Sequence, residues 1–326
     1  MTEAKNEGGL EIQKLADAAK LFTKNVGRVI VGKEEPIQWV FIGLLCGGHL
    51  LIEDVPGVGK TLLAKAAARS LGCTFKRIQC TPDLLPADVT GLHYFNQKIS
   101  EFEFRPGPIL ANLVLVDEIN RAMPRTQSCL LECMQEHQVT VDWHTFSLPR
   151  PFLILATQNP IELEGTFPLP EAQLDRFLLR VRLGYPSAAE EETILFRFQE
   201  TNPLDSLPVI FEAKELLDLQ RLSRQVYVEP TVRGYITTLT RATRSHADIR
   251  LGASPRSSLA LHSAAQARAA IQGRNYVIPD DVKSLFIPVI AHRLLIKAEA
   301  RMRGKTEEDV LMEILEQTSI PLEEPA

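Results

Sequence analysis

The chain has 326 residues, of which 45% are hydrophobic and 24% are charged, as in an ordinary folded globular protein. Its formal net charge of -5 argues against a dedicated nucleic-acid binder, and no apolar stretch is long enough to cross a bilayer. The N-terminal segment mixes charges and has no apolar centre, so it is no secretory signal, and we expect a cytoplasmic protein without membrane insertion.

The first part of the chain is predicted to hold a short tail and two helices. Residues 1–9 are polar and include a glycine pair, so we expect them to be disordered. Apolar residues between Ile12 and Val26 recur at helical spacing, which predicts an amphipathic helix. A second helix is expected over about 35–46, after a short turn.

Short apolar runs of strand length follow, and helical patterns separate most of them. These runs are 49–52, 75–79, 112–116, 152–156 and 177–183. Alternation of this kind predicts an α/β fold with a mostly parallel five-stranded sheet between helices.

From Pro186 onward the pattern becomes helical. Ser187 and Glu190 form a capping box that opens one helix, and Ser254 precedes a proline at the start of another. The helices expected here span 188–200, 212–225, 230–246, 255–271 and 279–297, with a short one after about 304. We therefore expect an α/β core over 10–186 and a helical domain with a C-terminal tail over 187–326.

Residues 53–61, EDVPGVGKT, directly follow an apolar run and have the pattern of a phosphate-binding loop. Backbone amides of such a turn and the N-terminus of the following helix attract an anion. Lys60 is expected to reach the β- and γ-phosphates of ATP, and Thr61 to hold Mg²⁺. Asp54 replaces the first glycine of the motif, and we expect its side chain to be solvated and turned away from the nucleotide. A glycine-rich turn without a ligand is the structural alternative.

The apolar run 112–116 delivers Asp117 and Glu118 at its carboxyl end, the edge at which open α/β sheets bind ligands. Asp117 is expected to hold Mg²⁺ through water, and Glu118 to orient and activate the attacking water. An Asp-Glu pair at a strand end is common by itself. Its position after a phosphate loop favours the catalytic interpretation.

Three polar side chains further along the chain complete the predicted site. Asn159 is expected to hydrogen-bond the γ-phosphate or the water, although an Asn-Pro turn explains it equally well locally. Arg176 is expected to reach the γ-phosphate of a neighbouring subunit, and the alternative is a surface pair with Asp175. Arg256, at the start of a lid helix, is expected to fold onto the phosphates.

The chain has five cysteines, an odd number without paired spacing, which indicates free thiols. Cys129, Cys133 and His137 recur every fourth residue and so share one helix face. A structural zinc site normally needs a fourth ligand. We therefore interpret the two cysteines as small apolar residues that pack inward.

The order of these elements resembles that of the AAA+ ATPases, and specifically of the MoxR family, over about residues 10–297. The runs that carry the resemblance are EDVPGVGKT, TPDLLPADVTG, EFEFRPGPILANLVLVDEINRA, TQSCLLECMQEHQVTVD, ATQNPIELEGTFPLPEAQLDRFLLRV, GYPS and GASPRSSLAL. The resemblance implies an AAA+ core with two inserted β-hairpins, followed by an all-α lid.

The resemblance also assigns a role to each predicted site residue. Lys60 and Thr61 correspond to Walker A, Asp117 and Glu118 to Walker B, Asn159 to sensor 1, Arg176 to the arginine finger and Arg256 to sensor 2. The implied catalytic residues are Glu118, Arg176, Asn159 and Lys60. The positions expected to bind ATP, including the strip that covers adenine, are Val31, Gly32, Pro56, Gly57, Val58, Gly59, Lys60, Thr61, Leu62, Asp117 and Arg256.

Family members assemble into rings, commonly hexamers with ATP between subunits, and the resemblance implies chaperone-like remodelling of a protein client beside a partner with a von Willebrand factor A domain. A nucleic-acid motor, a metal-chelatase motor subunit and a nucleotide-switched scaffold are the alternatives. Acidic composition counts against the first, and the intact Asp117-Glu118 pair counts against the last. The metal-chelatase motor subunit has a similar motor, so only the identity of the partner would distinguish it from a chaperone-like remodeller.

Two segments, 90–107 and 137–152, have the alternation of β-hairpins. At the tip of the second, where the family usually carries glycine, this chain has Trp143. That side chain is expected either to contact the client or the adjoining subunit, or to pack across its own hairpin.

Overall fold

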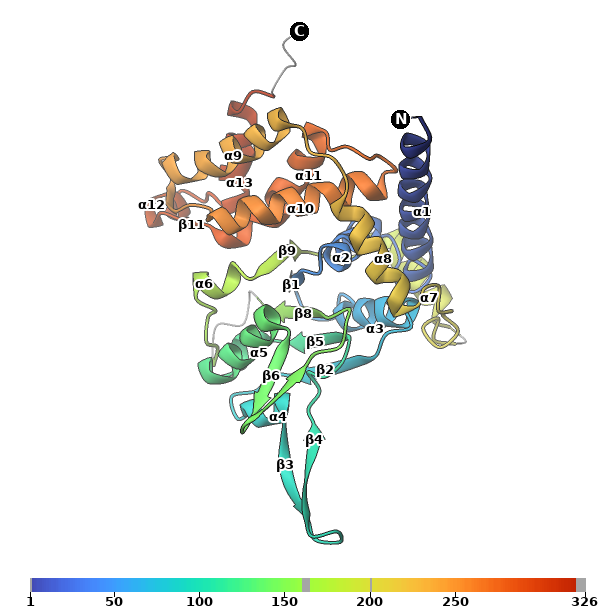
Figure 1. The fold of residues 1–326 in the computed structure, drawn as a ribbon. Helices are drawn as coiled ribbons and strands as arrows, with labels where there is room; N and C mark the ends of the chain where they lie inside the picture. Colours follow the sequence, from blue (N-terminus) through green and yellow to red (C-terminus); the bar gives the residue numbers. More distant parts are fainter. Residues whose placement is uncertain (1, 160–164, 200, 321–326) are drawn as a thin grey trace.

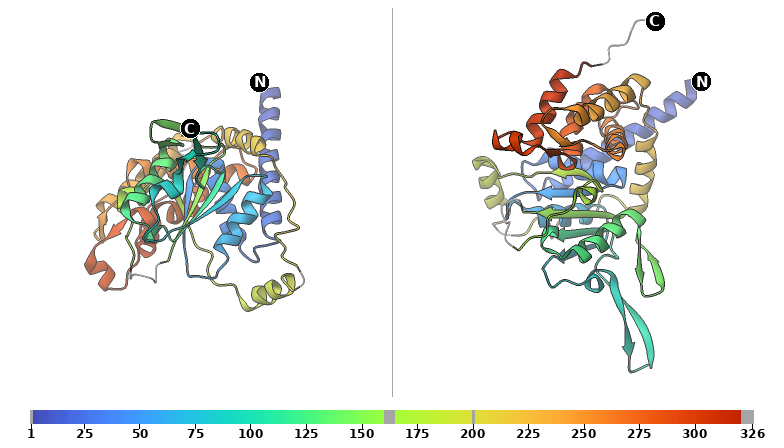
Figure 2. Two further views of the ribbon diagram at one scale, coloured as in Figure 1. Left: turned by 90° about the horizontal axis from the view of Figure 1, so that it is seen from below. Right: turned by 90° about the vertical axis from the view of Figure 1, so that its left-hand side faces the viewer.

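The structure is a computed structural model that describes residues 2–159, 165–199 and 201–320 (Figure 1). A five-stranded sheet lies between helices, and a helical layer built from the C-terminal half covers one end of the molecule (Figures 1 and 2). Four parts of the predicted pattern lie outside the described residues: residue 1 of the N-terminal tail, residues 160–164 after Asn159, residue 200 at the end of the helix predicted over 188–200, and residues 321–326 of the C-terminal tail.

The sheet has the order β2-β5-β8-β1-β9, and all neighbouring strands are parallel. Its strands are β1 (His49–Glu53), β2 (Phe75–Gln79), β5 (Leu113–Asp117), β8 (Leu153–Gln158) and β9 (Phe177–Val181). Each falls on a predicted run, and four of them read as continuous apolar stretches because they are buried on both faces, whereas β2 is an edge strand with largely exposed side chains. The predicted α/β fold class is confirmed, and the carboxyl ends of the five strands share one edge.

Two apolar clusters fill the two faces of this sheet. The helices around it are α1 (Thr2–Val26), α2 (Glu34–Cys46), α3 (Lys60–Ser70), α4 (Pro86–Thr90), α5 (Pro124–Glu136) and α6 (Glu171–Leu174). Leu113 and Leu115 of β5 belong to the cluster with α1, α2 and α3, and Val114 and Val116 belong to the cluster with α5. The first cluster also includes lid residues, so the core and the lid share one apolar interior.

The N-terminal segment differs from the sequence prediction. Residues 2–9 form the first turns of α1, whereas disorder was expected over residues 1–9. Each glycine in a helix costs about 1 kcal/mol relative to alanine. Extending an existing helix adds one hydrogen bond per residue, however, and the neighbouring Ala, Glu and Lys residues are good helix formers. The buried part of α1, which includes Phe22, nucleates a helix that continues through the glycine pair.

The lid is mostly helical, as predicted. It contains α7 (Ala188–Arg197), α8 (Ala213–Arg224), α9 (Pro230–Ser245), α10 (Pro255–Ile271), α11 (Pro279–Ile290), α12 (Ala298–Met302) and α13 (Glu307–Gln317). Both predicted N-caps are present, because Ser187 accepts from the backbone N–H of Glu190 and Ser254 from that of Ser257.

One lid helix is shorter than predicted. The helix expected over 279–297 ends at Ile290, and a 3₁₀ turn, Ala291–Arg293, follows it. The chain then forms β11 (Leu295–Ile296), which pairs with β10 (Ile249–Leu251). Pro288, inside α11, cannot donate the backbone hydrogen bond to the preceding turn, so it weakens the last turn of the helix.

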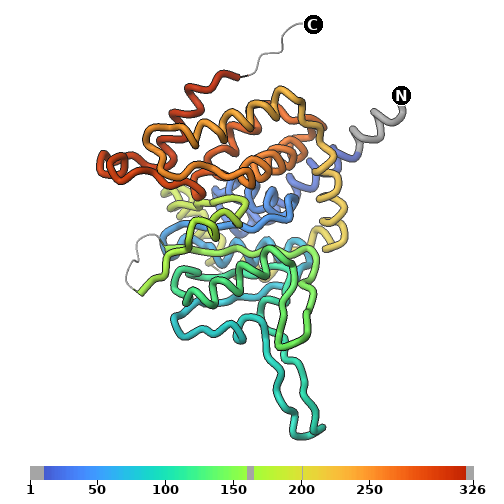
Figure 3. Tube along the Cα trace, turned by 60° about the vertical axis from the view of Figure 1, so that its left-hand side comes forward, coloured from blue at the N-terminus to red at the C-terminus, as the bar shows by residue number. Residues whose placement is uncertain are grey.

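Two antiparallel hairpins are present where hairpins were predicted. They are β3 (Gly91–Asn96) with β4 (Glu101–Pro106), and β6 (Gln138–Val141) with β7 (His144–Ser147). Figure 3 shows the β3–β4 hairpin projecting from the body of the molecule. At its base the two backbones approach so closely that a Cβ on Gly91 would lie 2.6 Å from the amide nitrogen of Gly107.

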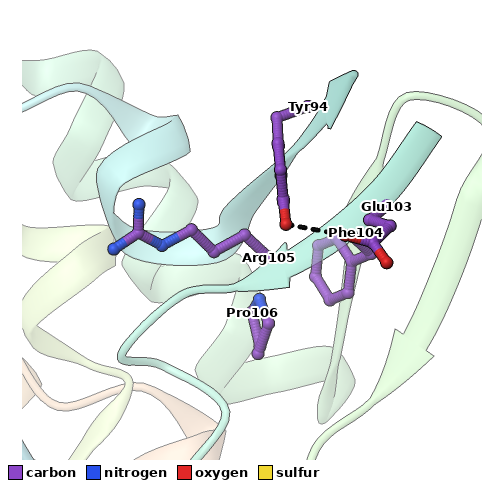
Figure 4. A pocket seen from close by; sticks show the side chains of 5 residues that line it. All are labelled: Tyr94, Glu103, Phe104, Arg105 and Pro106. Carbon is purple, nitrogen blue, oxygen red and sulfur yellow. Dashed lines mark hydrogen bonds between the residues drawn. The ribbon is translucent and has the colours of Figure 1, made fainter. Parts of the chain in front are cut away.

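Aromatic side chains stiffen the projecting hairpin. The rings of Phe95 and Phe102 meet across the strands with centroids 5.3 Å apart, although Phe102 is 73% exposed. The hydroxyl of Tyr94 donates to Glu103 over 2.7 Å, in a hollow on the hairpin (Figure 4).

The second hairpin is tied to the first and exposes its tip. Asp142 lies 2.9 Å from the ring Nδ1 of His93, a contact that joins the two hairpins. Trp143, beside it, is 84% exposed. Its side chain therefore does not bury itself across its own hairpin.

A buried ion pair joins the lid to the core. Arg293 is 3% exposed and donates to Asp175 over 3.0 Å and to the carbonyl oxygen of Phe177 over 2.6 Å. The hydroxyl of Ser254 also donates to Asp175, over 3.0 Å. Burial lowers the pKa of Arg293 to about 10, and the Asp175 carboxylate opposes this shift. Asp175 therefore holds the lid, and the predicted alternative of a surface pair with Arg176 is not formed.

We predict that Asp175→Ala destabilises the protein by about 3 kcal/mol, because the buried Arg293 guanidinium loses its counter-charge. Urea unfolding would measure this change. Asp218→Ala is the matched control, since Asp218 forms an exposed pair with Arg221, and it should cost less than about 1 kcal/mol. Equal losses in the two variants would contradict the prediction.

His49 fastens β1 to strand β8 and to helix α5. The backbone N–H of Ile154 donates to its Nδ1 over 2.9 Å, so the proton lies on Nε2, which donates to the Met134 carbonyl over 3.0 Å. Burial lowers the pKa of His49 from about 6.5 to about 4. The His49 ring is therefore neutral in the folded protein at neutral pH.

Because the unfolded chain binds this proton more tightly, the contribution of His49 is complete above about pH 6.5 and is lost as the pH falls through about 4. The loss reaches about 3 kcal/mol. Buried His292 has a pKa shifted in the same direction, so total stability falls further. We expect the fall in unfolding free energy between these pH values to be smaller in His49→Gln, and equal pH slopes would argue against this account.

Candidate functional site

The predicted phosphate loop connects β1 to α3 at the carboxyl edge of the sheet. Gly57 and Gly59 have φ of 85° and 95°, a left-handed backbone that disfavours any residue with a Cβ. Helix α3 starts at Lys60 and has no side-chain cap. Its first N–H groups therefore remain available to an anion.

Lys60 lies at the start of this helix with its ammonium group in the loop. Its Nζ donates to the backbone carbonyl of Asp54 over 2.7 Å. Burial lowers the pKa of Lys60, and the nearby carboxylates, first that of Asp54, act in the opposite direction. The loop thus holds a partly desolvated cation beside its free amides.

Asp54 is buried, whereas the sequence predicted a solvated side chain. Its carboxylate accepts from the backbone N–H groups of Leu183 and Gly184 over 2.6 and 2.7 Å, and from that of Val55 over 2.9 Å. The prediction was wrong because it could not see that the chain after β9 returns to the loop. Three N–H donors replace the water that the carboxylate gives up.

The acidic pair lies at the end of β5. Asp117 is buried, accepts from Thr157 Oγ1 over 3.2 Å, and forms an ion pair with Arg77 over 2.6 Å. Glu118 has a left-handed φ of 54°, and its backbone N–H also binds Thr157, over 2.9 Å. A non-glycine residue held in this conformation is typical of functional sites. Thr157 therefore positions both acids.

The Glu118 carboxylate is held at one oxygen. Arg121 donates to its Oε2 over 3.1 Å, and the side-chain amide of Gln79 approaches the same oxygen at 3.4 Å. The half-buried position of this carboxylate next to the loop is suitable for a general base.

A cavity of about 350 Å³ brings these groups together. It is lined by the loop residues from Pro56 to Leu62 except Val58, by the acidic pair, and by the buried Asn159. Val58 packs against the apolar core instead. Thr157 and, from β2, Arg77 and Gln79 also line the cavity, and the sequence analysis missed all three. Alternation along β2 could have indicated the last two, since they share one face of an edge strand.

The predicted adenine strip lies next to this cavity. Gly32 lines a second cavity, of about 520 Å³, together with Ile30. The Ile30 side chain reaches within 3.9 Å of the position of a Cβ on Gly59. Val31 is half-buried and does not line either cavity.

The two predicted arginines do not line the phosphate cavity. Arg176 donates to the Leu131 carbonyl over 2.7 Å and lines a separate cavity along α5. Arg256 is exposed in the first turn of α10, and its positive charge contributes to the lowered pKa of Arg293. One chain therefore assembles the loop, the acids and Asn159, but neither arginine.

The Cys129 and Cys133 thiols form a hydrogen bond with each other, which lowers the pKa of Cys129 and raises that of Cys133. Within residues 2–159, 165–199 and 201–320, no group of three or more His, Cys, Asp or Glu side chains could hold a metal ion. Cys133 packs into the apolar cluster beside α5, whereas Cys129 is half-buried.

The donor set around the cavity fits a nucleotide with Mg²⁺. The free amides of α3 and Lys60 suit phosphate oxygens, and the Thr61 hydroxyl and the Asp117 carboxylate are the hard oxygen ligands that Mg²⁺ prefers. The Arg77 guanidinium already on Asp117 shows that this carboxylate attracts a cation.

Comparison with known proteins agrees with this site. The family described as "ATPase family associated with various cellular activities (AAA)" matches residues 49–179, and the AAA lid domain matches residues 241–314. Protein YeaC of Bacillus subtilis is 48% identical over 303 residues, which are 93% of this chain and 95% of that protein. The chaperone MoxR1 of Mycobacterium tuberculosis is 42% identical over 305 residues, 91% of this chain and 80% of that protein.

The fold comparison gives the same result. A crystal structure of a proposed ATPase from Cytophaga hutchinsonii superposes with a TM-score of 0.90 at 36% identity, and the match covers 98% of this chain and 99% of the other. Among the described residues no helix is long and apolar enough to cross a membrane. Because the phosphate loop and its acids lie within a fold and a sequence shared with MoxR proteins over most of their length, this chain belongs to the MoxR family of AAA+ ATPases.

Proposed function

We propose that this ATPase depends on Mg²⁺ and works in the cytoplasm as a homo-oligomeric ring, by family resemblance a hexamer, which remodels or matures a protein partner. The observation that carries the proposal is the position of Arg176. It lies outside the phosphate cavity of its own chain and faces a separate cavity on α5. An arginine finger supplied by a neighbouring subunit needs this separation.

Within one subunit the other groups divide the chemistry among them. Lys60 and the first amides of α3 hold the phosphates, and Thr61 and Asp117 hold Mg²⁺, which supplies positive charge to the phosphoryl oxygens. Glu118 orients and activates the attacking water, and Asn159 binds the γ-phosphate or that water. Arg256 would complete the site from the lid.

The two hairpins are the surface that we propose for the protein client. Their exposed aromatic side chains, Phe102 and Trp143, are of the kind that dominates binding hot spots. The relative MoxR1 is named a chaperone, which supports a client of this type. A partner with a von Willebrand factor A domain is proposed from the family resemblance.

We predict that Arg176→Ala binds ATP normally but hydrolyses it at least about 100-fold more slowly, because transition-state charge loses its cation. Mixing it equally with Lys60→Ala, which should not bind ATP, is expected to restore part of the rate, since intact sites form at mixed interfaces. Steady-state ATP hydrolysis would measure both effects. Arg241→Ala, an exposed change on α9, serves as the control. Absence of rescue at equal mixing would count against a shared site.

We also predict that Trp143→Ala weakens either assembly or the response to a client. Casein, an unfolded protein, is the probe. The first measurement is the stimulation of ATP hydrolysis by casein. The second is assembly, followed by sedimentation in a Glu118→Gln background, which is expected to hold ATP without hydrolysing it. Tyr276→Ala removes an exposed aromatic side chain from the lid and should change neither. If Trp143→Ala also changes neither, the hairpin tip is not a contact site.

A further inference from the structure

A chain of side-chain contacts connects the two acids through β2. The Nε of Arg77 donates to Oδ2 of Asp117 over 2.6 Å, and its NH2 group donates to the side-chain oxygen of Gln79 over 2.8 Å. The amide nitrogen of Gln79 in turn reaches Oε2 of Glu118 at 3.4 Å. The residue proposed to hold Mg²⁺ is thus linked to the residue proposed to activate water.

The sheet builds this chain of contacts. Strands β2 and β5 are parallel, and their register places Gln79 opposite Asp117 and Arg77 opposite Leu115. Arg77 and Gln79 are two residues apart, so both project from the same face of β2. Because β2 is the outermost strand, water is close on its free side.

The two side chains of the Arg77–Asp117 pair differ in their exposure to solvent. The Arg77 side chain is 50% exposed and the Asp117 side chain is 9% exposed. Thr157 holds the other oxygen of the Asp117 carboxylate. The guanidinium can therefore move into water, whereas the carboxylate is fixed.

A second cation on the same carboxylate must compete with the first. The Asp117 carboxylate already accepts a hydrogen bond from the Arg77 guanidinium over 2.6 Å. It therefore binds Mg²⁺ more weakly than a carboxylate without such a partner. When Arg77 moves away from Asp117, the side-chain oxygen of Gln79 also loses its hydrogen bond from Arg77. The side-chain amide of Gln79 can then change its contact with Glu118.

We propose that Arg77 is a built-in counter-cation of Asp117, which has to be displaced before Mg²⁺ binds. Arg77 is then a positioning residue of the ATPase, not a catalytic one. The inference rests on the Mg²⁺ dependence proposed above.

The test is a Mg²⁺ titration of the binding of a fluorescent ADP analogue to the full chain, followed by anisotropy. Arg77→Gln should lower the Mg²⁺ concentration at half-saturation by about 3- to 10-fold, because the competing charge is gone from a half-exposed pair. Binding in EDTA should stay unchanged. Arg77→Lys, which keeps the charge, should remain close to the original chain.

Lys76→Gln is the matched control, because it removes the same charge from the neighbouring residue on the opposite face of β2 and should leave the Mg²⁺ midpoint unchanged. An unchanged midpoint in Arg77→Gln would overturn the inference. So would weaker binding of Arg77→Gln in EDTA, since that result would make Arg77 a phosphate ligand. If the original chain hydrolyses ATP equally with Mg²⁺ and in EDTA, the proposed Mg²⁺ dependence itself fails, which separates the two failures.

Discussion

The bond between the Asp54 carboxylate and two backbone amides fixes the phosphate loop to the junction of core and lid. Glycine, which the usual motif has at this position, has no side chain with which to make the connection. Separating the partners would leave the buried Asp54 carboxylate with the Val55 amide alone, and would leave the amides of buried Leu183 and half-buried Gly184 without these hydrogen bonds, at a cost of several kcal/mol. The segment after β9 therefore cannot move independently of the loop that holds phosphate.

Charged side chains extend this connection to the end of the chain. Glu53, just before the loop, pairs with Arg180 and Arg182, and Glu308 of α13 pairs with the same two arginines. Pairs that are partly exposed contribute little stability, but a network of this kind restricts orientation. The buried Arg293–Asp175 pair is a further ionic attachment of the lid to the core. Asp175 lies next to Arg176, so lid position and the proposed finger are linked through adjacent residues.

The sequence was sufficient for the sheet and for the centre of the site, because both depend on local signals. Continuous apolar runs mark buried strands, and glycines at 57 and 59 mark a left-handed turn. The burial of Asp54, the role of Asp175 and the position of Arg77 depend on chain segments that meet only in the folded protein. The end of α11 at Ile290 has the same origin, since β11 pairs with a strand more than forty residues earlier.

The glycine pair at the base of the β3–β4 hairpin has a mechanical consequence. Because Gly91 and Gly107 bring the two backbones into contact there, the strands leave the core as one stiff lever. A strand of 6 residues extends about 20 Å at roughly 3.3 Å per residue. A rotation of about 10° at the base would move the tip by roughly 3 Å, close to the rise of one residue in an extended peptide. A small adjustment in the core would thereby be amplified at the tip of the hairpin.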